Sequence, residues 1–117
     1  NVPFEVDGDG KNMRDLVFVR DLRKITKQLV ELPPFGSLIV SSGSIVSIRE
    51  LVNEIVTALE YKDEVVWHPE RDTGQKNKIP NNGRLKQLLP NATFTNLQEG
   101  IQKTVEWHVL VQNCNVH

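Results

Sequence analysis

Residues 8–22, GDGKNMRDLVFVRDL, join a glycine-rich turn, an arginine, an apolar segment and the start of a helix. The two glycines permit positive φ, so the chain can turn tightly there and bring Arg14 over a ligand. A planar guanidinium grips a phosphate through two parallel hydrogen bonds, which a lysine ammonium does not reproduce. The alternative is a hairpin turn followed by a surface ion pair between Arg14 and Asp15. From these residues alone we favour the hairpin, because short Gly-Asp turns commonly connect hairpin strands.

The composition is that of an ordinary globular protein. The 117 residues suit one domain, and 14 Lys+Arg against 15 Asp+Glu leave a formal net charge of -1, which provides no basic surface for nucleic acid. No apolar run approaches the roughly 20 residues that span a bilayer, so we expect a soluble protein without a membrane segment. Cys114 is the single cysteine, which excludes an internal disulfide and fits the reducing cytoplasm.

Strand-like and helix-like segments alternate along the chain. We expect strands at residues 3–6, 16–19, 37–42 and 65–67, with the first two as partners, and helices at residues 22–32, 48–59, 83–89 and 96–112. A long polar loop at residues 68–83 precedes the last two helices. The alternation indicates an α/β fold with short strands and about four helices, formed by residues 1–117 as a single domain.

Capping signals mark the starts of the expected helices. Ser47 can accept a hydrogen bond from the backbone of Glu50, whose side chain returns to the backbone of Ser47, so these residues predict a capping box. Side chains are also expected to cap the other three helices: Asp21, Asn82, and a second box of Thr95 with Gln98.

No catalytic or metal-binding set emerges from the residue types and spacings. The three histidines, His68, His108 and His117, are far apart and lack neighbouring cysteines or clustered carboxylates. Carboxylates in turns and loops rarely gain the burial or the close partner that acid–base catalysis requires. Cys114 lies in a tail that we expect to fray after about residue 112, with His117 as a disordered end.

Anion binding is the chemistry that the sequence supports. Arg14 in the turn and Arg71 and Lys78 in the long polar loop converge on a diphosphate if that loop folds back. The alternative is that Arg71 and Lys78 are solvated loop charges, and composition alone favours this alternative.

Read together, several stretches resemble the GDP-L-fucose synthases, a family of extended short-chain dehydrogenases that act on nucleotide sugars. Residues 8–22 look like the family stretch G-x-G-x-x-x-R-x-F-x-x-x-x-D-L. Three more stretches follow in the family's order: SIVSIRELVNEIV, VVWHPERDTGQKNK and NNGRLKQLLPNATFTNLQEGIQKTVEW. The family's tail pattern is matched by Pro90, Leu97, Glu99, Gly100, Ile101, Thr104 and Trp107. The resemblance covers residues 6–107.

The resemblance implies the C-terminal, mainly substrate-binding part of an NADP-dependent epimerase-reductase that makes GDP-L-fucose from GDP-4-keto-6-deoxymannose. In that family the arginine matched by Arg14 contacts the diphosphate, and the lysine matched by Lys78 contacts the nucleotide moiety. The Rossmann domain, the Ser-Tyr-Lys set, the Cys/His pair and the helices of the homodimer all lie upstream in the family. Together with the start at Asn1, without methionine, this suggests a fragment with no catalytic residues that does not bind NADP by itself.

Three positions depart from the family: Asp7 and Thr73 near the expected site, and Arg20, where the family often has an acidic residue. An aromatic residue that the family often carries beside the nucleotide is replaced by Asp7, which removes a stacking surface. The family's loop aspartate aligns with Thr73, while Asp72 stands one place earlier. The candidate substrate-binding residues are therefore Arg14, Lys78, Arg71, Asp7 and Thr73.

Two alternatives stay open. The chain is similarly compatible with a non-catalytic nucleotide-sugar-binding module. It also fits a fragment of another nucleotide-sugar epimerase or dehydratase, because an arginine on a diphosphate is indifferent to the base.

Overall fold

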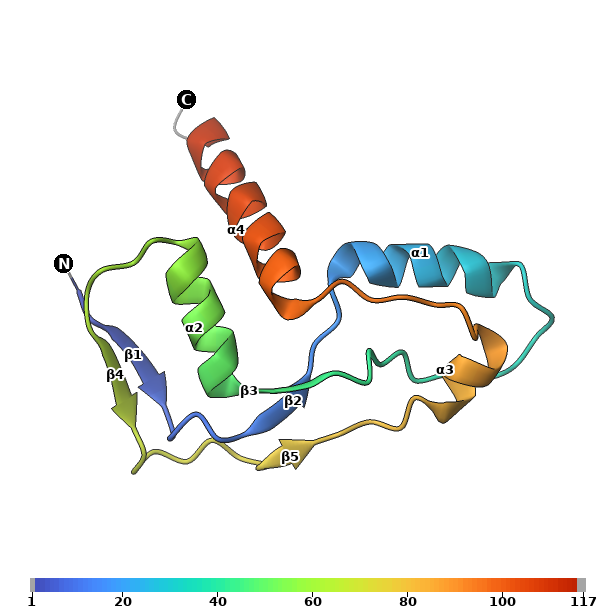
Figure 1. Ribbon diagram of the computed structural model, residues 1–117, viewed down its shortest axis with the longest axis horizontal. Coiled ribbons are helices and arrows are strands. Elements are labelled where there is room, and N and C mark those ends of the chain that lie inside the picture. Colours follow the sequence, from blue (N-terminus) through green and yellow to red (C-terminus); the bar gives the residue numbers. More distant parts are fainter. Residues whose placement is uncertain (1, 116–117) are drawn as a thin grey trace.

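A computed structural model describes residues 2–115, and it shows a flat, elongated α/β arrangement (Figure 1). Within these residues, five short strands and four helices occur in the order β1, β2, α1, β3, α2, β4, β5, α3, α4. The dimensions are 53 × 41 × 20 Å, and the radius of gyration of 17.1 Å exceeds the roughly 13 Å of a compact domain of this length. The α/β class with about four helices is confirmed.

The strands form two small sheets. β1 (Phe4–Asp7) pairs in parallel with β4 (Val65–His68). In the second sheet, β2 (Met13–Asp15) lies between β3 (Ile45–Ser47) and β5 (Asn77–Lys78), antiparallel to β3 and parallel to β5.

The glycine turn connects the two sheets, so the first two strands are not a hairpin. The prediction that these strands pair with each other is wrong, and so is the placement of a strand at residues 16–19. Residues 16–18 have no strand partner and instead line an apolar cavity beside α4 (Leu97–Cys114). The strand forms earlier, at Met13–Asp15, because β3 and β5 offer backbone partners there.

Asp21 and Thr95 contact each other instead of capping their own helices. α1 (Val19–Val30) begins at Phe18 without a side-chain cap. The buried Asp21 carboxylate accepts hydrogen bonds from the backbone N–H and the hydroxyl of Thr95, at 2.7 and 2.9 Å. Asn96 caps α4 by accepting from the backbone of Glu99 at 2.8 Å. The predicted caps by Asp21 and by Thr95 are therefore wrong. The contact between these two distant residues replaced the two local caps.

The capping box at α2 (Ile48–Ala58) is confirmed. The Ser47 hydroxyl accepts from the Glu50 N–H at 3.1 Å, and the Glu50 carboxylate accepts from the Ser47 N–H at 2.7 Å. α3 (Gly83–Leu88) begins after Asn82 as predicted, although the Asn82 side chain makes no capping hydrogen bond. α4 continues as a helix to Cys114 rather than fraying at residue 112, while His117 lies outside the described residues.

The strand predicted at residues 37–42 does not form. This segment passes over β2 without a ladder, and the Asp15 carboxylate accepts hydrogen bonds from Ser41, Ser42 and Gly43. A side chain therefore satisfies backbone groups that we had expected to pair with another strand.

The hydrophobic core is small for a chain of this length. Among residues 2–115, the almost fully buried apolar side chains are Ile25, Val52 and Leu85. Large apolar side chains remain exposed on the outer helices, including Val19 on α1 and Trp107 and Leu110 on α4. None of the described helices combines the length and the apolar character needed to cross a membrane.

Candidate functional site

A cavity of about 380 Å³ lies between the glycine turn and the first part of the loop that follows β4. Its walls come from β1, the turn, β2, the first residue of α2 and the loop. The lining residues are Asp7, Gly10, Asn12, Arg14, Ile48, Asp72 and Thr73. The sequence placed Arg14, Asp7 and Thr73 among the candidates, and the structure brings these three together.

The glycine turn packs tightly against a residue of β4 and a residue at the start of α2. Gly10 has φ +77°, and a Cβ atom on it would lie 2.6 Å from the Trp67 ring and 3.0 Å from the Cβ of Arg49. The Arg49 guanidinium stacks on the Trp67 ring at 4.2 Å and donates a hydrogen bond to the Asp9 carbonyl at 2.6 Å. The start of α2 and the end of β4 therefore fix the position of the glycine turn, which lines the cavity.

The loop folds back onto the turn. The Asn12 amide donates to the Thr73 hydroxyl at 2.8 Å, and the Met13 N–H donates to the Lys76 carbonyl at 2.9 Å. Gly8, with φ +87°, leaves room for the Thr73 methyl group, because a Cβ there would lie 2.5 Å from it. Loop residues more than 60 positions away in sequence thus form one wall of the cavity.

The side chain of Arg14 binds backbone carbonyl oxygens of the loop that forms this wall. Its guanidinium donates hydrogen bonds to the carbonyl oxygens of Met13 at 2.8 Å, Gln75 at 2.7 Å and Lys76 at 3.3 Å. A guanidinium carries five N–H donors, and acceptors within residues 2–115 take three of them. The arginine therefore both fixes the loop and keeps donors for a ligand.

The three cations of the anion-binding prediction do not meet at one point. Lys78 lies in β5 as the register partner of Arg14, so the two side chains leave the sheet on the same face. Arg71 lies at the ends of β1 and β4, where it forms ion pairs with Asp7 at 2.9 Å and Glu5 at 3.7 Å. Neither Lys78 nor Arg71 lines the cavity.

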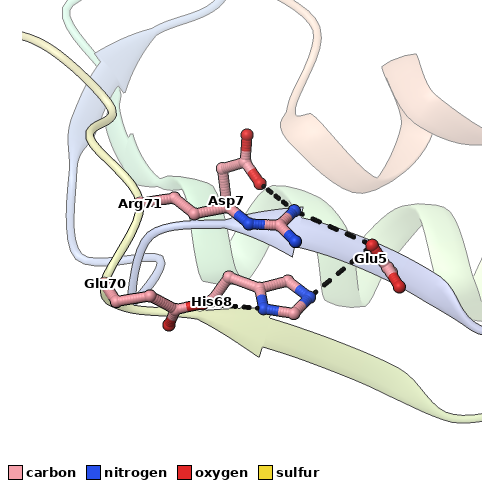
Figure 2. A network of polar contacts seen from close by, with 5 residues as sticks. All are labelled: Glu5, Asp7, His68, Glu70 and Arg71. Atoms are coloured by element: carbon pink, nitrogen blue, oxygen red, sulfur yellow. Dashed lines mark hydrogen bonds and ion pairs between the residues drawn. The ribbon is translucent and has the colours of Figure 1, made fainter.

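Arg71 belongs to a charged cluster formed with Glu5, Asp7, His68 and Glu70 (Figure 2). Figure 2 shows the imidazole lying between two carboxylates, with Nδ1 3.0 Å from Glu70 Oε1 and Nε2 3.6 Å from Glu5 Oε2. The hydrogen bond to Asp7 raises the pKa of Arg71. A hydrogen bond from its own backbone N–H, aided by His68, lowers the pKa of Glu70. The contacts of the cluster therefore favour the charged forms of Arg71 and Glu70.

The cavity walls suit a ligand with both anionic and hydroxyl groups. Arg14 supplies positive charge, the Asp72 carboxylate accepts hydrogen bonds, and Asn12 and Thr73 both donate and accept. The charge of Asp7 is offset by Arg71. Residues 2–115 contain no group of three metal-ligating side chains close enough to hold an ion.

Sequence reasoning missed Asn12 and Ile48 as lining residues. Asn12 is buried, with 8% of its surface exposed, yet asparagine beside glycines in a polar turn is typical of a solvated loop. Ile48 is the first residue of α2, and this position places it on the wall of the cavity. No local signal marks either residue as part of a site.

Comparison with known proteins gives consistent relatives over most of the chain. The GDP-L-fucose synthase of Dictyostelium discoideum is 30% identical over 112 residues, which are 93% of this chain and 35% of that protein. A dTDP-4-dehydro-6-deoxy-D-allose reductase from a Streptomyces species is 26% identical over 107 residues, covering 92% of this chain and 32% of that protein. No protein-family model matches the chain.

Comparison with solved structures finds the same kind of protein. A crystal structure of a GDP-L-fucose synthetase from Naegleria fowleri bound to NADP superposes with a TM-score of 0.83 at 21% identity, covering 93% of this chain and 35% of that one. The chain spans about a third of the length of the relatives it matches. In sequence the chain is similar to GDP-L-fucose synthase over most of its length, and its fold matches about one third of a GDP-L-fucose synthetase structure.

Proposed function

We propose that the cavity beside Arg14 binds the diphosphate of a nucleotide sugar. In this proposal the chain is the substrate-binding part of an epimerase-reductase that converts GDP-4-keto-6-deoxymannose to GDP-L-fucose. The observation that carries the proposal is the position of Arg14 on the cavity wall, with donors beyond those that hold the loop. Guanidinium donors of this kind form charge-assisted hydrogen bonds with phosphate oxygens.

Lys78 supports the same proposal from the neighbouring strand. It leaves β5 on the same face as Arg14 and is exposed, so it can reach a nucleotide that extends beyond the cavity. Arg71 acts indirectly in this proposal, because its ion pair with Asp7 offsets a carboxylate that would otherwise repel the diphosphate.

The proposed enzyme needs a cofactor-binding domain, and the structure offers a face for it. An apolar cavity of about 620 Å³ lies between the residues before α1 and the first half of α4, with Leu16, Phe18, Leu51, Leu97 and Ile101 among its lining. We propose that an NADP-binding Rossmann domain of the parent protein covers this face, in a cytoplasmic enzyme that can form a homodimer. The elongated shape and small core agree with a partner domain.

The residues of this chain do not fit the cofactor themselves. A Rossmann pyrophosphate site needs a glycine turn that opens a helix. Here the glycine turn leads from β1 into strand β2 instead. NADP binding and hydride transfer therefore belong to the proposed partner domain.

The base of the nucleotide is a separate question. The relatives include proteins named for GDP and dTDP sugars, and the cavity recognises mainly charge and hydroxyl groups. The second candidate function is therefore the same site in another nucleotide-sugar epimerase, reductase or dehydratase, or in a non-catalytic module. Competition between GDP, UDP and dTDP for the cavity discriminates the possible nucleotide bases, and the absence of heat on titration with millimolar GDP would remove the non-catalytic module.

Removing the Arg14 guanidinium tests the proposal. We expect Arg14→Ala to weaken GDP binding by roughly tenfold, because charge-assisted hydrogen bonds to the phosphates are lost. Calorimetric titration of the chain with GDP measures this change. Arg23→Ala, an exposed site on α1, is the matched control because it removes the same charge far from the cavity. Equal affinities of the two variants, or no heat from the unmodified chain at millimolar GDP, would contradict the proposal.

A further inference from the structure

We infer that Asn12 is a positioning residue, which acts through Thr73 to set the wall of the cavity. We call the hydrogen bond between these two side chains the latch. The inference rests on the proposed function of the cavity, but the latch itself is a property of the loop and is tested separately below.

The latch joins two segments that have no regular structure of their own. Asn12 lies between the glycine turn and β2, and Thr73 lies in the loop 61 residues later. The Asn12 amide donates to the Thr73 hydroxyl at 2.8 Å, and Asn12 is 8% exposed. A buried side-chain amide without a partner costs free energy, so the loop is favoured in the position where Thr73 supplies that partner.

Asn12 itself is held firmly, so it can position its neighbour. Its carbonyl accepts a hydrogen bond from the Ile48 N–H at 3.0 Å, at the start of α2, and the adjacent Met13 pairs with Ser47 in the second sheet. Asn12 is therefore tied to α2 and the second sheet, and its amide supplies a fixed partner for Thr73.

Steric fit against Gly8, as well as the hydrogen bond to Asn12, determines the position of Thr73. Its methyl group occupies the space that a Cβ atom on Gly8 would fill, so Thr73 contacts the turn at Gly8 as well as at Asn12. Asp72 and Thr73 line the cavity side by side. Moving Thr73 would therefore displace the Asp72 carboxylate and the loop carbonyls that Arg14 holds.

Two other side-chain attachments of this loop use charged groups. Arg71 contacts Asp7 at the near end, and Arg14 contacts the carbonyls of Gln75 and Lys76 at the far end. The latch is a neutral side-chain contact between them. The latch holds the middle of the loop with an uncharged amide and a hydroxyl. It therefore uses none of the Arg14 N–H donors, and those that do not bind carbonyls remain for the ligand.

The test uses a pair of substitutions at one position. Thr73→Val removes the hydroxyl and keeps the shape, whereas Thr73→Ser keeps the hydroxyl. Amide exchange at Met13, whose N–H donates to the Lys76 carbonyl, reports opening of the loop without any ligand. We expect Thr73→Val to accelerate this exchange and to weaken GDP binding, each by about fivefold, as the loss of one net hydrogen bond implies. Thr73→Ser should stay within about twofold of the unmodified chain.

A double-mutant cycle separates the latch from general destabilisation. Asn12→Ala and Asn12→Ala with Thr73→Val should both show the exchange rate of Thr73→Val alone, because one interaction is lost in each. Asn53→Ala, on the exposed surface of α2, should leave exchange and binding unchanged. Fully additive effects, or equal behaviour of the Val and Ser variants, would overturn the inference. If the unmodified chain does not bind GDP while the exchange results hold, the proposed function fails and the latch stands.

Discussion

Replacing Asp15 with alanine is expected to lower the free energy of unfolding by about 3 kcal/mol. The carboxylate accepts four hydrogen bonds from the segment that crosses β2, from the hydroxyls of Ser41 and Ser42 and from the N–H groups of Ser42 and Gly43. Ser41 is 1% exposed, so its hydroxyl would lose its partner away from water. Urea denaturation followed by tryptophan fluorescence measures the effect.

The same carboxylate predicts how this stability depends on pH. Burial raises the pKa of Asp15, but the hydrogen bonds from Ser41, Ser42 and Gly43 outweigh burial and hold the pKa below its ordinary value. A carboxyl whose folded pKa is lowered stabilises the protein above its unfolded pKa and loses that contribution as the pH falls through the folded pKa. The stability difference between the unmodified chain and Asp15→Ala should therefore shrink as the solution is acidified below about pH 4.

Asp63→Ala is the control for Asp15, because it removes the same charge from an exposed position. It should change the free energy of unfolding by less than about 0.5 kcal/mol. An Asp15 variant as stable as this control would contradict the role assigned to the carboxylate.

Replacing Gly10 with alanine is expected to cost about 3 kcal/mol of stability. Part of this cost is the positive φ of +77°, and part is the overlap of the new methyl group with the Trp67 ring at 2.6 Å. The ring cannot retreat easily, because the Arg49 guanidinium stacks on it. Denaturation in urea measures the total, and a change in Trp67 fluorescence, recorded in a Trp107→Phe background, reports the displaced ring.

Gly36→Ala separates the two contributions. Gly36 has the same φ of +77°, but no atom lies within 4 Å of a Cβ built on it. This variant should therefore cost only about 1 kcal/mol, the penalty of the backbone conformation alone. Equal losses at the two glycines would show that Trp67 does not pack tightly against the turn.

Elements set by neighbouring residues were predictable from the sequence. The box of Ser47 and Glu50 formed where local chemistry placed it. α3 starts after Asn82 as predicted, although the expected cap by the Asn82 side chain is absent. Elements set by distant partners were not. The carboxylates of Asp15 and Asp21 bind segments 26 and 74 residues away, and both contacts replaced local structure that the sequence alone favoured.

The candidate site likewise has one part that neighbouring residues predicted and another part that depends on distant partners. Glycines at positions 8 and 10 followed by Arg14 form a local motif, and the arginine does lie on a cavity wall. The use of its guanidinium on loop carbonyls depended on the fold of residues 69–76, which carries no local signal. The burial of Asn12 required the loop and α2 together, so no pattern within the turn revealed it.

The central claim is that the cavity between the glycine turn and the loop receives the diphosphate. Titrating the isotope-labelled chain with GDP while recording backbone amide chemical shifts tests it most directly. The account predicts that the largest shifts occur at Gly10, Asn12, Arg14, Thr73 and Gly74, with α1 unaffected. Saturable shifts confined to the apolar face of α4, or the absence of saturable shifts anywhere, would contradict it.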